Sequence, residues 1–237
     1  MEQTVNSSPV IIHAEGLCRY YQRGIETVKA LDNVSLDIHQ GEMISVLGPS
    51  GSGKTTLINL LSCLDVPTAG TLVVNGKSVT GLSEDQLVEV RRGTLGFIFQ
   101  QFHLLPTLTV AENVELPLLF LGKPTNREFT MSVLEMVGLG ERVSHLPREL
   151  SGGQMQRVAI ARALVIKPKV LIADEPTGNL DKANGEAIFS LFRRLVKDEK
   201  LTVIITTHNL NFGYTADRII TLEDGKIVRE ETKKPEV

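Results

Sequence analysis

A nine-residue segment, Gly48 to Thr56, has the composition of a phosphate-binding loop. Its letters, GPSGSGKTT, follow the apolar run MISVL and fit the pattern G-x-x-x-x-G-K-[ST]. The glycines let the backbone curl so that successive N–H groups point inward, while Lys54 reaches the outer phosphates and the Thr55 hydroxyl is placed for Mg²⁺. The sequence therefore predicts a nucleotide site formed by Gly48, Pro49, Ser50, Gly51, Ser52, Gly53, Lys54, Thr55 and Thr56.

Two adjacent carboxylates, Asp174 and Glu175, end the apolar run in KVLIADEPTGNLD. A buried strand that delivers acids at its carboxyl end beside a phosphate loop is how P-loop NTPases hold Mg²⁺ and activate water. We expect Asp174 to bind the metal through water and Glu175 to polarise the attacking water. The alternative is a strand that ends in a solvated acidic turn, which the upstream phosphate loop disfavours.

A third segment, LSGGQMQRVAIARAL, predicts a long helix with Ser151 as its N-cap. Gly152 and Gly153 leave the first amides of this helix exposed, which favours a second anion site. An ordinary capped helix is the alternative. Because one triphosphate needs no second cradle from the same face, we expect a dimer in which one subunit's Ser151, Gly152 and Gly153 close on the nucleotide held by the other.

Short apolar runs rich in β-branched residues predict the strands that position these segments. Helical patterns lie between several of the runs, which favours an α/β fold with a mainly parallel core. Residues 10–40 and 70–80 are expected to add a small antiparallel sheet, since Asn75 and Gly76 form a turn signal. The runs are PVIIHAEGL, VSLDI, MISVLG, TLVVNG, LGFIFQ, KVLIAD, TVIITTH and RIITLEDGKIV.

The strand signal is absent from about Gln101 to Arg148. Three segments there read as helices separated by Gly and Pro: TVAENVELPLLFLG, REFTMSVLEMVGLG and ERVSHLPREL. We therefore predict one domain over residues 1–237, with an ATP-binding core and β subdomain in 1–99 and 156–237 and a helical subdomain inserted at 100–155. The charged tail REETKKPEV is expected to be frayed.

Composition excludes several classes of protein. The 237 residues carry 25 Lys+Arg against 28 Asp+Glu, a formal net charge of −3, and no basic run, so nucleic acid is not expected as a main partner. Cys18 and Cys63 have no metal-ligand or C-x-x-C spacing, which suits a reducing compartment and two buried apolar side chains. No secretion signal or membrane span is evident, so a soluble, non-secreted protein is expected.

Together the motifs resemble those of an ABC transporter ATPase over essentially the whole chain. GPSGSGKTT resembles its Walker A motif, FQQ its Q-loop, LSGGQ its signature, VLIADE its Walker B motif with the catalytic Glu, GNLD its D-loop and TTHN its H-loop. The resemblance implies a P-loop NTPase core of the RecA type with a small antiparallel β subdomain and an inserted helical subdomain. It also implies two ATP molecules held between head-to-tail subunits of a homodimer.

The resemblance assigns further roles. It implies that Gln100 lies at the Mg²⁺ and the attacking water, that His208 contacts the γ-phosphate, that Asp181 communicates across the dimer, and that Gln154 belongs to the signature acting in trans. The adenine is expected to stack on Tyr20 or Tyr21; counting from ALDNVSL favours Tyr21. The expected catalytic residues are thus Glu175, His208 and Gln100, and the expected metal ligands are Thr55, Gln100 and Asp174.

The sequence around the motifs is similar to that of the MacB, LolD and FtsE group. The segments are SCLDVPTAG, RRGTLGFIFQQFHLLPTLTVAENVELPL and DEPTGNLD. This implies an FtsX- or MacB-like permease partner, a cytoplasmic position on the inner face of the cell membrane reached only through that permease, and work in export, lipoprotein release or mechanotransmission. A non-transport ABC ATPase and a binding subunit without catalysis are the alternatives; missing insertions and an intact Glu175 and His208 speak against them.

In that family a permease coupling helix docks near the Q-loop. The resemblance therefore implies that Phe102, Leu104 and Leu105 are apolar anchors beside Gln100. The alternative is that these side chains belong to the core of the helical subdomain, because buried apolar side chains are common.

Overall fold

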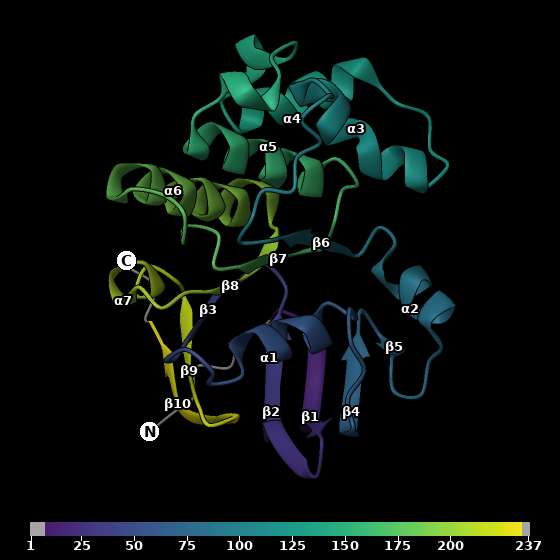
Figure 1. The fold of residues 1–237 in the computed structure, drawn as a ribbon, viewed down its shortest axis with the longest axis vertical. Coiled ribbons are helices and arrows are strands. Elements are labelled where there is room, and N and C mark those ends of the chain that lie inside the picture. The colour runs from purple at the N-terminus through teal and green to yellow at the C-terminus, as the bar shows by residue number, and fades with distance from the viewer. Residues whose placement is uncertain (1–7, 234–237) are drawn as a thin grey trace.

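A six-stranded sheet forms the centre of the fold in the computed structural model, which describes residues 8–233 (Figure 1). The strand order is β10-β9-β3-β8-β7-β6, and all neighbours are parallel except β10, which is antiparallel to β9. This confirms the predicted α/β fold with a mainly parallel core. The strands are β3 (Met43–Leu47), β6 (Leu95–Ile98), β7 (Val170–Asp174), β8 (Thr202–Thr206), β9 (Arg218–Glu223) and β10 (Lys226–Thr232).

The three central strands are apolar because both faces of a parallel sheet are covered. Every residue of β3 and β8 is buried, as are the first four residues of β7. Parallel strands end at a common edge, so the carboxyl ends of β3, β7 and β8 meet there. Each of these ends leads into one of the segments expected to do chemistry.

A second, antiparallel sheet has the strand order β2-β1-β4-β5. It confirms the predicted small β subdomain. Its last two strands meet at the predicted turn, where Asn75 and Gly76 have φ angles of 48° and 76°. Helix α1 (Lys54–Leu61) contributes to the hydrophobic cluster shared by the two sheets. The strands are β1 (Val10–Arg23), β2 (Glu26–His39), β4 (Ala69–Val74) and β5 (Lys77–Ser78).

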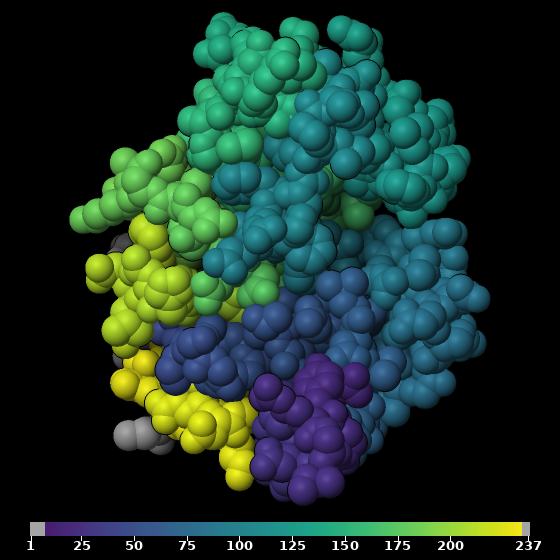
Figure 2. All heavy atoms as spheres, in the orientation of Figure 1, coloured from purple at the N-terminus to yellow at the C-terminus, as the bar shows by residue number. Residues whose placement is uncertain are grey.

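The remaining helices cover the other face of the central sheet or flank its edges. Figure 1 shows α3, α4 and α5 as a layer beyond α6, and Figure 2 shows these teal and green residues forming one end of the molecular surface. The helices are α2 (Glu84–Arg91), α3 (Val110–Phe120), α4 (Arg127–Met136), α5 (Gly152–Leu164), α6 (Lys182–Glu199) and α7 (Leu210–Gly213).

The helical layer shares one hydrophobic cluster with the central sheet. Side chains of α3, α4 and α5 pack in this cluster with side chains of β7, β8 and α6. Helix α5 is continuous across the predicted boundary between residues 155 and 156. The division into 1–99, 100–155 and 156–237 therefore stays a prediction.

The helix expected in ERVSHLPREL is absent from the described structure. Two single turns of 3₁₀-helix occur instead, η1 (Gly140–Arg142) and η2 (Pro147–Glu149). Pro147 provides no backbone N–H and disfavours the helical conformation of the residue before it. Leu146 accordingly has φ −89° and ψ 155°, and its N–H donates to Glu149 Oε2 at 2.6 Å.

The expectation of a frayed tail is wrong for residues 229–232. These residues belong to β10 and pair with β9, and Glu230 accepts hydrogen bonds from Arg218. Residues 234–237 lie outside the described residues. Arg229 and Glu230 are exposed and Glu231 is half-buried. Charge is compatible with this position because β10 is an edge strand that pairs on one side only.

The two cysteines differ in burial. Cys63 is buried as predicted, and burial raises the pKa of its thiol to about 11. Cys18 is only half-buried, so the prediction is wrong for this residue. Its thiol donates to Gly16 O at 3.6 Å, and its sulfur accepts from the Asn33 N–H at 3.3 Å.

A buried ion pair fixes β9 beside β3. Arg218 Nη1 donates to Glu42 Oε1 at 2.8 Å, and the two residues are only 9% and 6% exposed. The same oxygen accepts from the His39 N–H at 2.7 Å. Burial raises the pKa of Glu42 despite these two bonds. Loss of the arginine would therefore leave an uncompensated carboxylate in the interior.

We predict that Arg218→Met lowers the free energy of unfolding by about 3 kcal/mol at pH 8, because it leaves the buried Glu42 carboxylate without a charged partner. Without Arg218 the folded-state pKa of Glu42 rises further above its unfolded value, so the loss should shrink as the pH falls toward 5 and the folded state takes up a proton. Chemical denaturation at both pH values measures this. Glu230→Gln is the control, since the side chain of Glu230 is 43% exposed. A defect of equal size at both pH values would contradict the account.

Candidate nucleotide site

The loop between β3 and α1 leaves no room for side chains at two of its glycines. A methyl group built on Gly53 would lie 2.4 Å from Ala30 O, and Gly53 has φ 102° at the N-cap of α1. A methyl group on Gly48 would lie 2.2 Å from Leu222 O. Only glycine fits such positions, so the backbone turns tightly against β2 and β9.

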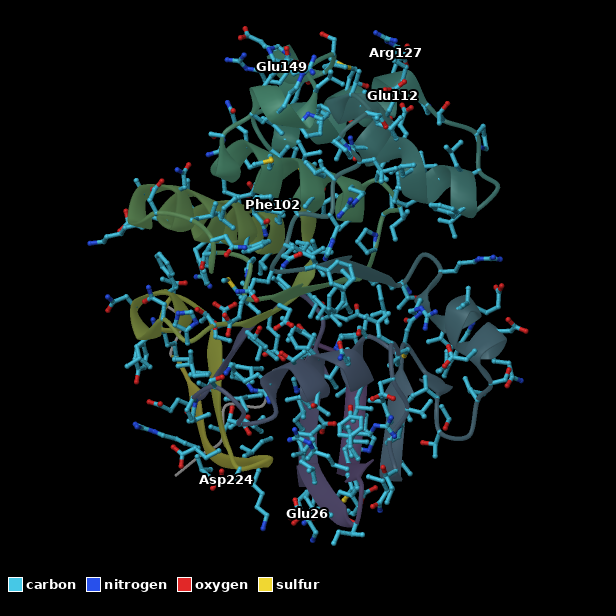
Figure 3. The ribbon with its side chains drawn as sticks, viewed as in Figure 1. Glu26, Phe102, Glu112, Arg127, Glu149 and Asp224 are labelled. Atoms are coloured by element: carbon cyan, nitrogen blue, oxygen red, sulfur yellow. The ribbon has the colours of Figure 1, made fainter. Side chains whose placement is uncertain are left out.

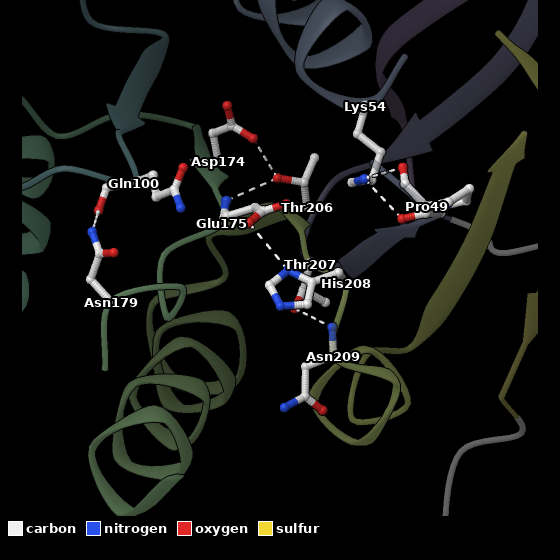
Figure 4. Close-up of polar contacts among 11 residues, drawn as sticks. Pro49, Lys54, Gln100, Asp174, Glu175, Asn179, Thr206, Thr207, His208 and Asn209 are labelled. Carbon is white, nitrogen blue, oxygen red and sulfur yellow. Dashed lines mark hydrogen bonds and ion pairs between the residues drawn. The ribbon is translucent and has the colours of Figure 1, made fainter. Parts of the chain in front are cut away.

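Lys54 lies almost buried at the start of α1. It is 6% exposed, and its ammonium donates to Gly48 O and Pro49 O, both at 2.8 Å (Figure 4). The Ser52 hydroxyl is buried in the same loop without a hydrogen-bond partner. A cation, a hydroxyl without a partner and the N-terminus of a helix thus belong to one short loop, and these are groups that bind phosphate.

A pocket of about 380 Å³ opens beside this loop, a size typical of sites for small ligands. Strand β2, the loop, α1, Glu175 and the β9–β10 turn form its walls, and Figure 3 shows Asp224 at that turn. Glu175 also lines a second cleft of about 370 Å³ that reaches His208. The first pocket is lined by Val28, Lys29, Ala30, Ser50, Gly51, Gly53, Lys54, Thr55, Thr56, Glu175, Asp224 and Gly225.

The Thr206 hydroxyl joins the two predicted acidic residues. It donates to Asp174 Oδ1 at 2.6 Å and accepts from the Glu175 N–H at 2.9 Å (Figure 4). Asp174 and Thr206 pair across the ends of β7 and β8. Thr206 is the first residue of the predicted H-loop TTHN, but the motif assigned it no role of its own. The pairing of two parallel strand ends is the signal that could have identified its contacts.

Glu175 has a left-handed backbone with φ 44°, which is unusual for a residue other than glycine. Its carboxylate oxygen Oε2 lies 3.2 Å from His208 Nδ1. The His208 side chain is 65% exposed and that of Glu175 is 24% exposed. The structure therefore brings these two predicted catalytic residues into contact at the open edge of the sheet.

Gln100 lies at the same edge, after β6. Figure 4 shows its amide pointing toward Asp174 and Glu175. The backbone carbonyl of Gln100 accepts from Asn179 Nδ2 at 3.2 Å, and a methyl group built on Gly178 would lie 2.9 Å from the Gln100 Nε2 atom. The segment after Glu175 thus packs on the predicted Q-loop.

Ser151 caps α5 as predicted. Its hydroxyl accepts from the Gln154 N–H at 3.3 Å, and the Gln154 side chain accepts from the Ser151 N–H at 2.8 Å. Residues 151–154 are absent from the lining of the phosphate-loop pocket within the part of the chain that the structure describes. Within one chain, the structure does not bring this segment to the predicted nucleotide site.

Asp181 caps α6. The backbone N–H of Asn184 donates to one carboxylate oxygen at 2.9 Å and the Asn184 side chain to the other at 2.6 Å. These two bonds lower the pKa of the Asp181 carboxyl, so it stays ionised. Sequence reasoning did not single out Asn184.

The two candidate base-stacking tyrosines have different partners. The Tyr20 hydroxyl donates to Asp32 at 2.7 Å, and the Tyr21 hydroxyl donates to Asp65 at 2.8 Å. Their partners in the β2 ladder, Lys29 and Val28, line the pocket. The choice of Tyr21 stays a prediction.

The residues expected at Mg²⁺ offer oxygen ligands only. They are the Thr55 hydroxyl, the Asp174 carboxylate and the Gln100 amide. Residues 8–233 contain no group of three or more His, Cys, Asp or Glu that could hold a metal ion. Mg²⁺ is usually bound by one or two carboxylates together with substrate phosphates and water, so this donor set fits it.

Comparison with known sequences identifies the family. The sequence model of the family described as ABC transporter matches residues 31–178, more than half of the chain. The chain belongs to the ABC transporter ATP-binding family. It is therefore an ABC ATPase with the fold that its motifs predicted, and the recognition of the family from six motifs is confirmed.

Several relatives of this ABC ATPase are similar over nearly its whole length. An uncharacterised ABC transporter ATP-binding protein, MJ0796 of Methanocaldococcus jannaschii, is 44% identical, and the match covers 93% of this chain and 97% of that protein. YknY of Bacillus subtilis, another uncharacterised ABC transporter ATP-binding protein, is 46% identical, and the match covers 92% of this chain and 95% of that protein. The macrolide export ATP-binding/permease protein MacB of Bdellovibrio bacteriovorus is 45% identical over 93% of this chain but 34% of its own length.

Solved structures of ABC transporter cassettes have the same fold as this chain. A dimeric structure of MJ0796 is similar with a TM-score of 0.86 and 43% identity, covering 94% of this chain and 99% of that one. A second dimeric structure of MJ0796, in a post-hydrolysis state bound to ADP and Pi, has the same TM-score at 42% identity. Among the described residues of this chain, no helix has the length and apolar character of a membrane span.

Proposed function

We propose that this ABC ATPase forms a homodimer around two ATP molecules and powers a separate FtsX- or MacB-like permease. One observation carries the proposal: the chain builds a lysine-containing phosphate pocket with Glu175 in its wall, while its signature segment lies outside that pocket. The two dimeric structures of MJ0796 support the proposal, because a dimer is the assembly in which each pocket could receive a signature from the other subunit.

In the proposed reaction, the Lys54 ammonium gives up its hydrogen bonds to the backbone carbonyls of Gly48 and Pro49 and binds phosphate oxygens of ATP instead. Gly48, Pro49, Ser50, Gly51, Ser52, Gly53 and Thr56 form the rest of the cradle. Thr55, Asp174 and Gln100 would hold Mg²⁺, which neutralises charge on the phosphates. The Tyr21 ring would stack on the adenine.

Glu175 is the proposed base that orients and polarises the attacking water. The Thr206 hydroxyl bonds both the Glu175 backbone N–H and the Asp174 carboxylate, so it orients the metal ligand relative to the backbone that carries the base. His208 would leave Glu175 for the γ-phosphate when ATP binds, since its exposed ring has no other partner among the described residues.

The signature residues Ser151, Gly152, Gly153 and Gln154 would close on the nucleotide of the partner subunit, and Asp181 would face the same site. A helix N-terminus attracts anionic groups, so the γ-phosphate of the partner's ATP is the group that the α5 N-terminus would bind. Hydrolysis would remove that bridge and open the dimer.

A membrane partner is proposed because this chain matches about a third of MacB, whose name joins ATP binding to a permease. The permease would hold the ATPase at the inner face of the cell membrane. Export, lipoprotein release and mechanotransmission are the roles to be distinguished, since the permease would make the substrate contacts.

The proposed docking region lies beside Gln100. Leu105 is 46% exposed, whereas Leu104 packs against the hydrophobic cluster of the helical layer. Phe102 lies between that layer and the central sheet (Figure 3). Leu105 is therefore the anchor that a permease helix could reach, while Leu104 and Phe102 would support the surface from below.

We predict that Glu175→Gln lowers steady-state ATPase turnover by about 100-fold or more while ATP binding stays within about two-fold, because only the base is lost. The variant should accumulate as an ATP-bound dimer on size-exclusion chromatography. Glu186→Gln is the matched control, since Glu186 shares only the second cleft with Glu175. Turnover within a few-fold of wild type would remove Glu175 from the catalytic role.

We predict that Leu105→Asp reduces copurification with a co-expressed FtsX-like permease and removes permease-stimulated ATPase activity, because a charge replaces an apolar contact. ATP binding and thermal unfolding of the isolated chain should be unchanged. Leu119→Asp is the control, because Leu119 is 63% exposed at the far end of α3. Leu104→Ser should instead lower stability, by about 2 kcal/mol. Unchanged copurification of Leu105→Asp would sink the docking assignment.

A further inference from the structure

The second glycine of the signature segment is enclosed by its own subunit. Gly153 is buried, whereas Ser151 is exposed and Gly152 is half-buried. A methyl group built on Gly153 would lie 2.3 Å from Asn184 Oδ1, 2.8 Å from Asn184 Cγ and 3.2 Å from Asn184 Cβ. The whole Asn184 side chain, and not only its tip, would have to move to admit it.

Two hydrogen bonds tie Asn184 to Asp181, one of them from its side chain. Its Nδ2 atom donates to Asp181 Oδ2 at 2.6 Å, and its backbone N–H donates to Asp181 Oδ1 at 2.9 Å. A carboxylate only accepts, so the amide nitrogen must face Asp181. The amide oxygen consequently faces Gly153, and any rotation away from Gly153 breaks the bond to Asp181.

A second contact joins the same two segments. A methyl group built on Gly152 would lie 3.4 Å from Leu180 Cδ2, which is ordinary van der Waals contact. The two signature glycines therefore lie against Leu180, just before the Asp181 cap of α6, and Asn184, in its first turn. Helix α6 runs beside α5 (Figure 1). The tolerance differs: position 152 has room for a methyl group and position 153 has none.

We propose that Asn184 is a positioning residue that locks the signature helix to the Asp181 cap within one subunit, and that Gly153 lacks a side chain because Asn184 occupies that space. This inference rests on the proposed function, in which the signature and Asp181 of one subunit both face the partner's nucleotide. Their relative position decides whether both reach it together.

A substitution at Gly153 should therefore weaken ATP-dependent dimerisation by changing contacts within one subunit. An alanine there would push Asn184 off Asp181, so the cap of α6 and the start of α5 would shift relative to each other. Removing the Asn184 side chain would make room for the methyl group and restore the spacing of the two helices, although Asp181 would lose one hydrogen bond.

The test compares Gly153→Ala, Asn184→Ala and the Gly153→Ala/Asn184→Ala double variant. We expect Gly153→Ala to lower kcat by about ten-fold, Asn184→Ala to lower it by about three-fold, and the double variant to match Asn184→Ala. Binding of a fluorescent ATP analogue to the monomer should stay constant, since the Lys54 pocket is untouched. ATP-dependent dimerisation, measured for each variant in the Glu175→Gln background, should show the same ranking as kcat measured with Glu175 intact. Circular dichroism confirms that each variant is folded.

Gly152→Ala with and without Asn184→Ala is the matched control, and Asn184→Ala should rescue nothing there. A double variant no more active than Gly153→Ala would overturn the inference, because Gly153 would then be needed by the nucleotide itself. Failure of the proposed function gives a different result: Ser151→Arg and Gly153→Ala would both leave ATP-dependent dimerisation unchanged.

Discussion

Lys54 is a buried residue, and two backbone carbonyls are the partners that its ammonium has in the described structure. A buried cation without a carboxylate is costly unless hydrogen bonds or an anionic ligand compensate it. The loop achieves this by turning so tightly that Gly48 and Gly53 admit no side chain. That turn in turn requires β3 to be anchored between β8 and β9, with α1 starting at the pocket.

The same sheet edge supplies the groups that we propose to act on a bound phosphate. Thr206 connects Asp174 and Glu175 across two parallel strand ends, and Gln100 reaches this edge from β6. With the phosphate loop that follows β3, groups from four separate segments meet at this edge because parallel strands end together. The signature segment lies elsewhere, on α5, where its glycines lie close to Leu180 and Asn184. In the proposed dimer these contacts would fix the shape of the second half of each site.

The sequence alone predicted the segments whose chemistry depends on local spacing. The phosphate loop, the acidic strand end and the N-cap at Ser151 all follow from residues a few positions apart, and the structure has each of them. The helix expected over 141–150 was wrong because Pro147 interrupts it, and the tail joined the sheet because Glu230 meets Arg218, twelve residues earlier. Thr206 and Asn184 depend on contacts between strands and helices distant in sequence, which spacing does not encode.

The central claim is that each nucleotide site combines Lys54 of one subunit with Ser151 of the other. A heterodimer of a Lys54→Ala subunit and a Ser151→Arg subunit places both defects in one site, so the other site stays intact and ATP-dependent crosslinking should persist. A heterodimer of wild type with a chain carrying both substitutions should instead damage both sites and close poorly. Differentially tagged subunits, in the Glu175→Gln background, allow both measurements. The opposite order, with closure retained only in the second heterodimer, would show that Lys54 and Ser151 serve the same subunit and would contradict the account.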